Sequence, residues 1–332
     1  MIQDAPVASI QVEDIPQAVR KAYWLIQSHI VRTPLVRSDY FSQKTGANVL
    51  LKLENHQVTS SFKARGAIHK VLTLTQDERK RGVITASTGN HGIAVAYGLS
   101  LSGGQGIVVV PETASLVKVE NIRRLGAEVR FHGTDSGQTE IFARRYAAEQ
   151  GMIYISPYND PKVIAGQGTL GLEVAEQTGR VDFLFASVGG GGLICGTAGY
   201  LKMVRPGIRT VGCSPENDPA MIRSIEAGKI VEVEAKPTLS DGSAGGVEPG
   251  AITFKLCRTL VDHWVLVSEA EIAAAMRLFI ENEHQLLEGA AASAIAGFLK
   301  RASETPDEFK DKNVVIVICG ARISLDALKS VL

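Results

Sequence analysis

The sequence predicts an α/β protein with two domains, each built on a mostly parallel sheet flanked by helices. Strand-like and helix-like segments alternate from about residue 63 to residue 150, and the alternation starts again near residue 182. Such a βαβ rhythm is typical of parallel sheets covered by helices. The 332 residues, with 45% apolar residues and 33 glycines, suit two compact domains with many tight turns.

The expected elements follow the hydrophobic periodicity and the turn residues along the chain. A helix is expected near residues 17–29, and the proline in 33–35 favours an extended segment there. The Gly-, Ser- and Pro-rich stretch 237–249 is expected to be a long loop, and Ser268 with Glu271 resembles a capping box that opens a helix. The expected strands are 48–54, 82–86, 106–110, 128–131, 182–187, 210–213, 263–267 and 313–319. The other expected helices are 90–101, 115–125, 138–148, 191–203, 251–260 and 288–298, with one more short helix at the end.

The domain division follows the two runs of alternation. We assign residues 1–55 and 151–332 to a large domain, and residues 56–150 to a small domain inserted in it. No internal repeat, low-complexity stretch or obvious linker separates the two, so we expect them to pack closely. The functional site is then expected in the cleft between them.

Charge and cysteine usage exclude several classes of protein. The chain has 35 basic and 35 acidic residues, so it offers no electrostatic footprint for nucleic acid or an anionic membrane. Residues 183–201 carry no charge, but six glycines interrupt them, which argues against a membrane span. The start, residues 1–14, lacks the pattern of a secretory signal. The cysteines form no CxxC pair, which favours a reducing compartment, and we expect a cytoplasmic protein; they are Cys195, Cys213, Cys257 and Cys319.

Lys63 lies where a strand and a loop lead into a helical pattern. The partial positive charge of a helix N-terminus disfavours the protonated amine, and burial would act in the same direction. A neutral lysine is a nucleophile for an aldehyde. Taken alone, such a residue is most simply a solvated lysine at the start of a helix, and it is the motifs later in the chain that favour the nucleophile.

Ser87, Thr88, Asn90 and His91 occupy a turn that follows one expected strand and opens a helix. Their hydroxyl and amide groups, with the free backbone N–H groups of the turn, could hold a carboxylate or a ring hydroxyl. The alternative is an ordinary helix cap.

Four successive glycines, Gly189, Gly190, Gly191 and Gly192, connect an apolar strand to a helix. With no Cβ in the way, their N–H groups can converge on a phosphate at the helix N-terminus. The spacing fits neither the dinucleotide fingerprint nor a P-loop. A plain tight turn is the alternative, although ordering four glycines costs much entropy. We call residues 189–192 the glycine turn.

Cys319 ends a buried strand and is followed by glycine. Its thiol could face the edge of a ligand as a weak donor or acceptor. A buried cysteine can also be simply a core residue.

Together these four stretches closely resemble the fold-type II pyridoxal-phosphate enzymes, a fold like that of the tryptophan synthase β subunit, in the branch of threonine/serine dehydratases and serine racemase. The resemblance runs from about residue 33 to the C-terminus. It rests on the order and spacing of the patterns SFKxRGA, SxGNHG and the glycine turn.

The resemblance implies pyridoxal 5'-phosphate as the cofactor. Lys63 would bond covalently to its aldehyde, Phe62 would pack beside the ring, and Asn90 would bind the ring hydroxyl. The glycine turn would cradle the phosphate. Cys319 falls where the family places a serine or threonine against the pyridine nitrogen. A thiol cannot keep that nitrogen protonated as an aspartate would, so we infer a damped electron sink that favours prompt loss of a β-hydroxyl group.

The resemblance also implies a small amino acid as the substrate. Ser87, Thr88, Asn90 and His91 would line the loop that grips its carboxylate. Lys63 would take the α-proton, and the products would be a 2-oxo acid and ammonia. Thr88 would lie on the opposite face, where a serine in the racemase branch returns a proton. The family commonly forms dimers, so a homodimer is expected.

The sequence departs from the family pattern at three places. Arg322 stands where relatives commonly have asparagine, and it could face solvent or alter the packing behind the ring. Residues 212–215 lack the acidic residue that binds a divalent cation in some relatives. Glu216, Asp218 and Glu288 leave a metal site open, but none is expected. The loop 241–246 fits a mobile lid at the substrate side.

The leading hypothesis is therefore a lyase that dehydrates and deaminates L-threonine or L-serine. A racemase on the same scaffold, or a dehydratase of another hydroxy amino acid such as 3-hydroxyaspartate or a hydroxyectoine-derived compound, is a second hypothesis. A third is a non-catalytic binding protein in which Arg322 marks lost activity. Retention of Lys63 argues against the third, since a mere binder needs no covalent bond to the cofactor.

Overall fold

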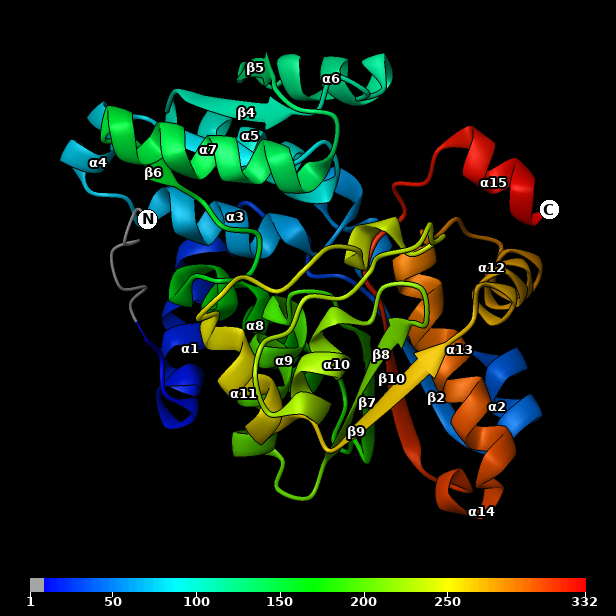
Figure 1. Ribbon diagram of the computed structural model, residues 1–332. Helices are drawn as coiled ribbons and strands as arrows, with labels where there is room; N and C mark the ends of the chain where they lie inside the picture. Colours follow the sequence, from blue (N-terminus) through cyan, green and yellow to red (C-terminus); the bar gives the residue numbers. More distant parts are fainter. Residues whose placement is uncertain (1–8) are drawn as a thin grey trace.

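The computed structural model describes residues 9–332. Its elements form two separate sheets, with the smaller sheet and its helices above the larger one in Figure 1. Residues 1–8 lie outside the described residues. They belong to the segment 1–14, which is expected from its sequence not to be a secretory signal.

The larger sheet has six strands: β1 (Leu35–Arg37), β2 (Asn48–Leu53), β7 (Phe183–Ser187), β8 (Arg209–Pro215), β9 (His263–Val267) and β10 (Asn313–Ile318). Their order is β1-β2-β10-β7-β8-β9. Strand β1 is antiparallel to β2, and the other neighbours run parallel. Both faces of a parallel sheet are covered, which explains why β7 and β10 are almost continuously apolar and buried.

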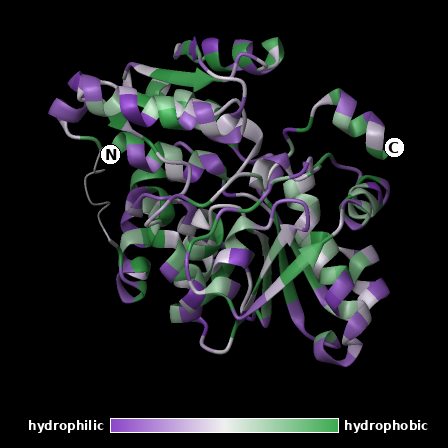
Figure 2. Ribbon diagram, in the orientation of Figure 1, coloured by the Kyte–Doolittle hydropathy of each residue, from purple (hydrophilic) through white to green (hydrophobic). Residues whose placement is uncertain are grey.

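Helices cover both faces of this sheet. On one side lie α1 (Ile15–Ile26), α8 (Pro161–Gln177), α9 (Gly192–Val204), α10 (Ala220–Ala227) and α11 (Ile252–Leu260). On the other lie α2 (Asp39–Thr45), α12 (Glu269–Glu283), α13 (Gly289–Glu304) and α14 (Pro306–Phe309), and α15 (Leu325–Val331) packs on α12. The apolar residues concentrate in the strands between these two layers (Figure 2), where the largest core cluster lies.

The smaller sheet has four parallel strands: β3 (Val83–Ala86), β4 (Gly106–Val110), β5 (Glu128–Phe131) and β6 (Ile153–Tyr154), in the order β5-β4-β3-β6. Its helices are α3 (Lys63–Leu72), α4 (Gln76–Arg81), α5 (Asn90–Ser102), α6 (Leu116–Arg123) and α7 (Ser136–Gln150). Helix α7 packs against β3, β4 and β6, whereas α5 packs against β3, β4 and α3. Because β6 joins this sheet, the sheet itself extends past residue 150, and the domain division stays a prediction.

The predicted fold class is confirmed, and each expected strand lies within a few residues of an observed one. The capping box at Ser268 and Glu271 is present at the start of α12. The structure also contains four short 3₁₀ helices: η1 (Val12–Asp14), η2 (Glu54–His56), η3 (Val58–Ser60) and η4 (Asp241–Ser243). The loop expected at 237–249 is irregular apart from η4.

The long helix α8 is an element that the sequence pattern does not predict. Gly166, Gly168 and Gly171 dilute its helical signal, because glycine is a poor helix former. The structure explains them: a Cβ at Gly166 would lie 2.6 Å from the Arg65 carbonyl oxygen, and one at Gly171 would lie 2.7 Å from the Thr197 carbonyl oxygen. The glycines let α8 pack closely against α3 and α9.

Candidate functional site

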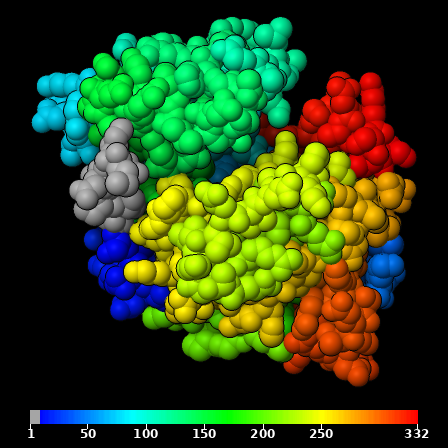
Figure 3. Space-filling model, viewed as in Figure 1, coloured from blue at the N-terminus to red at the C-terminus, as the bar shows by residue number. Residues whose placement is uncertain are grey.

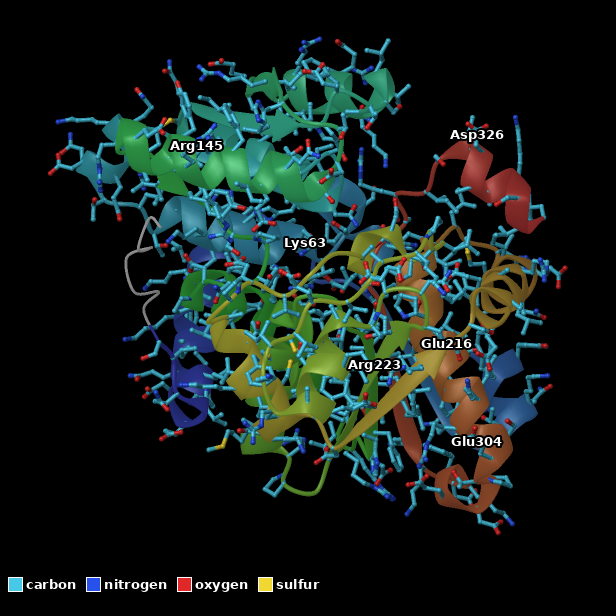
Figure 4. The ribbon with its side chains drawn as sticks, in the orientation of Figure 1. Lys63, Arg145, Glu216, Arg223, Glu304 and Asp326 are labelled. Carbon is cyan, nitrogen blue, oxygen red and sulfur yellow. The ribbon has the colours of Figure 1, made fainter. Side chains whose placement is uncertain are left out.

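The carboxyl ends of strands from both sheets lead into the predicted motifs. Strand β3 runs into Ser87, β7 into the glycine turn and β10 into Cys319. Ligands of open α/β sheets bind outside the carboxyl ends of the strands. Lys63 is the first residue of α3. Figure 4 labels it at the boundary between the part of the chain built on the smaller sheet (the small-sheet part) and the part built on the larger sheet (the large-sheet part).

The amine of Lys63 lies in a half-buried position at the start of α3. Its Nζ donates a hydrogen bond to the Pro157 carbonyl oxygen at 3.0 Å and lies 5.2 Å from the centre of the Phe62 ring. Burial lowers its pKa to about 8, and Cys319 and Glu288 act in the opposite direction. A sizeable fraction of the amine is therefore neutral near pH 8, as a nucleophile requires.

The segment before Lys63 is held against the end of β10. Thr59 and Ser60 have positive φ angles of 62° and 59°, an uncommon conformation for residues with side chains. The N–H of Phe62 donates to the Cys319 carbonyl oxygen at 3.0 Å, and the N–H of Ala321 donates to the Ser60 carbonyl oxygen at 3.0 Å. These two backbone bonds fix the lysine beside the predicted ring-binding cysteine.

Tyr158 links the lysine to the glycine turn. It follows Pro157, the hydrogen-bond partner of Lys63, and its side chain packs against the turn. A Cβ added at Gly190 would collide with the Tyr158 ring, and one at Gly192 would lie 2.9 Å from the Cβ of Tyr158. Gly191 has φ of +86°, and its Cβ would lie 2.8 Å from the Cys257 sulfur. Glycine is thus required for packing as well as for any approach of a ligand to the backbone.

Three helices begin at this site without a side-chain cap. The N-cap residues of α3, α5 and α9 are Phe62, Gly89 and Gly191, none of which has a side chain that can accept a hydrogen bond from the helix. In contrast, Ser268 caps α12 away from the site. Uncapped N-termini leave N–H donors and a partial positive charge, so α5 and α9 are suited to binding anionic groups.

A buried carboxylate, Glu288, connects two of the predicted cofactor residues. The Asn90 Nδ2 donates to both of its oxygens, at 3.0 and 2.8 Å, and the Cys319 sulfur lies 3.7 Å from its Oε1. The Arg322 N–H donates to its Oε2 at 3.3 Å. Burial raises the pKa of Glu288 to about 7, and the Asn90 hydrogen bond opposes this rise.

The remaining predicted residues lie on the turn between β3 and α5. Ser87 and Thr88 are half-buried, and the Ser87 hydroxyl accepts the Gly89 N–H at 3.2 Å. His91 is buried, and its Nε2 donates to the Ile155 carbonyl oxygen at 3.0 Å. Burial and the nearby Lys63 lower its pKa to about 3, so the imidazole is neutral. Its bond to the main chain of Ile155 fixes the ring beneath the turn.

Comparison with known proteins identifies the family. The model of the family described as "Pyridoxal-phosphate dependent enzyme" matches residues 26–320. The chain belongs to this family. The resemblance inferred from the three sequence patterns is therefore confirmed, and the enzyme uses pyridoxal 5'-phosphate.

The relatives of this enzyme include both lyases and racemases. It is 39% identical over 323 residues to "L-threonine ammonia-lyase" of Thermotoga maritima, covering 97% of this chain and 78% of the relative. The processed form of threonine deaminase isoform 2 from Solanum lycopersicum has a TM-score of 0.91 at 30% identity, covering 99% of this chain and 97% of that one. Maize serine racemase has a TM-score of 0.88 at 30% identity, covering 95% of both chains.

The residues at the site fit this cofactor. Three buried polar atoms, Ser61 Oγ, Asn90 Oδ1 and Ser187 Oγ, have no hydrogen-bond partner within residues 9–332. Such atoms are costly in a protein interior and indicate that something polar completes them. The lysine with a lowered pKa suits the aldehyde of the cofactor, and the uncapped helix that follows the glycine turn suits its phosphate. The polar atoms without partners suit its substituted ring.

Sequence reasoning missed the position of Glu288, which it considered only as a metal ligand. The signal was available, because a glutamate immediately precedes Gly289 at the start of an apolar helix. Asp218 accepts the Gly245 N–H at 2.6 Å, and Glu216 lies 3.8 Å from Lys300. The three acidic residues considered for a metal thus have separate partners. Within residues 9–332 no group of three His, Cys, Asp or Glu side chains is arranged to hold a metal ion. Among the same residues, no helix has the length and apolar character needed to span a membrane.

Proposed function

We propose that this enzyme eliminates the β-hydroxyl group of a small amino acid, L-threonine or L-serine, to give a 2-oxo acid and ammonia. The relatives named for threonine deamination align with nearly the whole chain, at 38% identity over 328 residues for "L-threonine dehydratase catabolic TdcB" of Escherichia coli. The observation that carries the proposal is the lowered pKa of the Lys63 amine. This amine lies between the glycine turn and Cys319 at the end of β10.

Lys63 acts as the base in this proposal. Pyridoxal phosphate, when bound, supplies an aldehyde that condenses with amines and a ring that withdraws electrons from the adjacent carbon. Substrate exchange frees the Lys63 amine, which then takes the proton from the α-carbon. The C–O bond at the β-carbon breaks next, and the proton held by Lys63 can pass to the leaving hydroxyl. Water then releases ammonia from the product.

The chain's other groups bind and orient. The glycine turn and the N-terminus of α9 would hold the cofactor phosphate, Phe62 would pack beside the ring, and Asn90 and Cys319 would meet the ring hydroxyl and nitrogen. The N-terminus of α5, with Ser87 and Thr88, would hold the substrate carboxylate, since its N–H groups lack a side-chain cap. His91, buried and neutral, would support this turn from below.

Racemisation is the second candidate, and Thr88 is the residue that favours it. Its hydroxyl lies on the same turn as Ser87 and is half-buried. A hydroxyl opposite Lys63 could return a proton to the other face of the α-carbon, and the fold is shared with maize serine racemase.

The decisive assay separates these reactions. The purified enzyme with added pyridoxal phosphate is offered L-threonine and L-serine, and 2-oxo acid and D-amino acid are measured together. We expect oxo acid to exceed D-amino acid, and Lys63→Ala to abolish both, while the exposed Lys80→Ala leaves both unchanged. A protein that binds the cofactor but releases no oxo acid from either substrate would contradict the proposal.

We also propose a cytoplasmic homodimer. Trp24 and Leu25 near the end of α1 expose 75% and 40% of their surface, which is unusual for such side chains and would suit a contact with a second copy. The four cysteines are free thiols, as expected in a reducing compartment. Sedimentation equilibrium tests the dimer, and cell fractionation tests the location.

A further inference from the structure

Glu288 is held in a single position by contacts from several segments. Its own N–H donates to the Gly320 carbonyl oxygen at 3.0 Å, and its carboxylate receives the Asn90 amide and the Arg322 N–H. A Cβ at Gly320 would lie 2.7 Å from its Oε1, so only glycine leaves room for the carboxylate there. The side chain is 2% exposed. This carboxylate is therefore held rigidly in contact with Asn90 and Cys319, the two residues predicted to meet the cofactor ring.

The carboxylate fixes which end of the Asn90 amide is available. Both Glu288 oxygens accept from Nδ2, and the buried Oδ1 is left without a partner in the described part of the chain. An acceptor at Glu288 can only be met by the NH₂ end of the amide. The amide oxygen of Asn90 is thereby presented to whatever occupies the site.

The same carboxylate faces the thiol of Cys319. Cys319 is 2% exposed, and its sulfur lies 3.7 Å from Oε1. A thiol has one proton, so it either donates to Glu288 and offers its lone pairs elsewhere, or it accepts from a protonated Glu288 and donates elsewhere. The charge of Glu288 thus decides whether Cys319 offers a donor or an acceptor to a ring nitrogen.

We propose that Glu288 is a positioning residue that couples Asn90 and Cys319, and that its proton sets the hydrogen bond offered to the pyridine nitrogen. This inference rests on the proposed placement of Asn90 at the ring hydroxyl and of Cys319 at the ring nitrogen. Glu288 touches neither the substrate nor the reacting carbon in this account, and it acts only through these two side chains.

The surroundings of Glu288 allow its proton to exchange with solvent. A cavity of about 110 Å³ reaches it from the side of α15, and its lining combines Thr238, Asp241, Ser324 and Glu288 itself with apolar residues. The charged or titratable groups that act on Glu288 are Asp241, Cys319, Lys63 and Arg322. Burial and Asp241 raise the pKa of Glu288 to about 7, so its charge changes within the working range of pH.

Glu288→Gln tests the coupling with a nearly isosteric change. A glutamine at this position presents an NH₂ group to one of the Asn90 donors, which forces one amide to turn. It also cannot change charge. The matched control is Glu281→Gln, an exposed carboxylate near the end of α12. The readouts are the affinity of each apoprotein for pyridoxal phosphate and the absorbance of the bound cofactor as a function of pH.

We expect the wild type and Glu281→Gln to show a spectral transition with a midpoint near pH 7, where Glu288 titrates. In Glu288→Gln the transition should disappear, and cofactor affinity should fall about tenfold or more, the size of a lost hydrogen bond to a charged group. If Glu288→Gln binds the cofactor within about twofold of wild type and keeps the transition, the inference is wrong. A wild type that forms no cofactor band at all would instead refute the proposed function.

A double-mutant cycle keeps the test valid if Glu288→Gln is destabilised. Cys319→Ala and the double variant are measured in the same way, and thermal unfolding of the apoproteins shows which of them fold. Coupled residues should give losses in affinity that are not additive, the double variant being about as weak as the worse single variant. Additive losses would show that the two residues act independently and would overturn the coupling.

Discussion

Lys63 combines two environments that act on the pKa of its amine in opposite directions. Burial lowers this pKa to about 8, whereas Cys319 and Glu288 raise it. The type of residue and its place at a helix start were predictable from the sequence, because the motif spacing is specific. The hydrogen bond to Pro157 was not, because that residue lies 94 positions away and no local pattern reports it.

The lowered pKa predicts how the apoprotein takes up its cofactor. Only the neutral amine attacks an aldehyde, so the rate constant of pyridoxal phosphate uptake should rise with pH and level off above about pH 8. Stopped-flow absorbance over a range of pH measures this rate. A rate that keeps rising to pH 10 would show an ordinary, exposed lysine.

Glu288 and His91 show the limit of motif-based reasoning about single residues. His91 lies inside a specific motif, yet the structure fixes its ring to the Ile155 main chain, and a substrate contact stays a prediction. Glu288 lies outside the three family patterns, yet it contacts Asn90 and Cys319. Contacts between residues 198 positions apart follow from tertiary packing alone.

Helix α3 is anchored two residues beyond the lysine by a fully buried charge network. Arg65 binds Glu54 at 2.7 and 2.8 Å and Glu173 at 2.7 and 2.9 Å. Lys52 binds Glu173 at 2.6 Å. Two cations and two carboxylates balance each other, which makes their burial tolerable. The network joins β2, α3 and α8, so it sets the position from which Lys63 projects.

Removing one cation should be costly for these three elements. We expect Arg65→Met to destabilise the apoprotein by about 3–5 kcal/mol, because two buried carboxylates then face only Lys52. The control is Arg223→Met, which breaks the half-exposed pair with Glu226 and should cost no more than about 1 kcal/mol. Denaturant unfolding measures both variants. If the two variants unfold at the same denaturant concentration, the buried network does not stabilise the protein as proposed.

The elements themselves were predicted unevenly. Strands such as β4 and β10 are short apolar runs bounded by turn residues, and the sequence pattern locates them well. Helix α8 was not predicted, because its glycines weaken the local helical signal. The same glycines allow close packing against α3 and α9, and this tertiary packing stabilises the helix. The same residues that hide this helix from sequence analysis are the ones its packing needs.

In the whole molecule, a loop of the large-sheet part reaches the small-sheet part. Glu248 accepts hydrogen bonds from Ser156 at 2.9 Å and Asn159 at 2.8 Å, and it pairs with Arg144 of α7 at 2.5 Å. Lys118 of α6 lies 3.9 Å from Asp241 in the same loop. In Figure 3 the yellow-green surface of the 210–250 region lies directly below the green surface of the small-sheet part. These ion pairs attach the loop to helices of the small-sheet part, and the same loop packs against the glycine turn, where a Cβ at Gly189 would collide with the Ser243 carbonyl oxygen.

Weakening this attachment should loosen the loop. In Glu248→Gln we expect amide hydrogen exchange of residues 238–250 to become about tenfold faster, since the part-buried ion pair with Arg144 is lost. The control, Glu234→Gln, changes an exposed carboxylate just before the loop and should exchange like the wild type. Unchanged exchange in Glu248→Gln would mean that other contacts hold the loop.

The most direct test of the account is to locate the covalent attachment of the cofactor. The purified enzyme is loaded with pyridoxal phosphate, reduced with borohydride and digested, and the modified peptide is sequenced by mass spectrometry. The account predicts a pyridoxyl group on Lys63 alone, and none in Lys63→Ala. A modification found on another lysine, or no modification in a protein that has bound the cofactor, would contradict it.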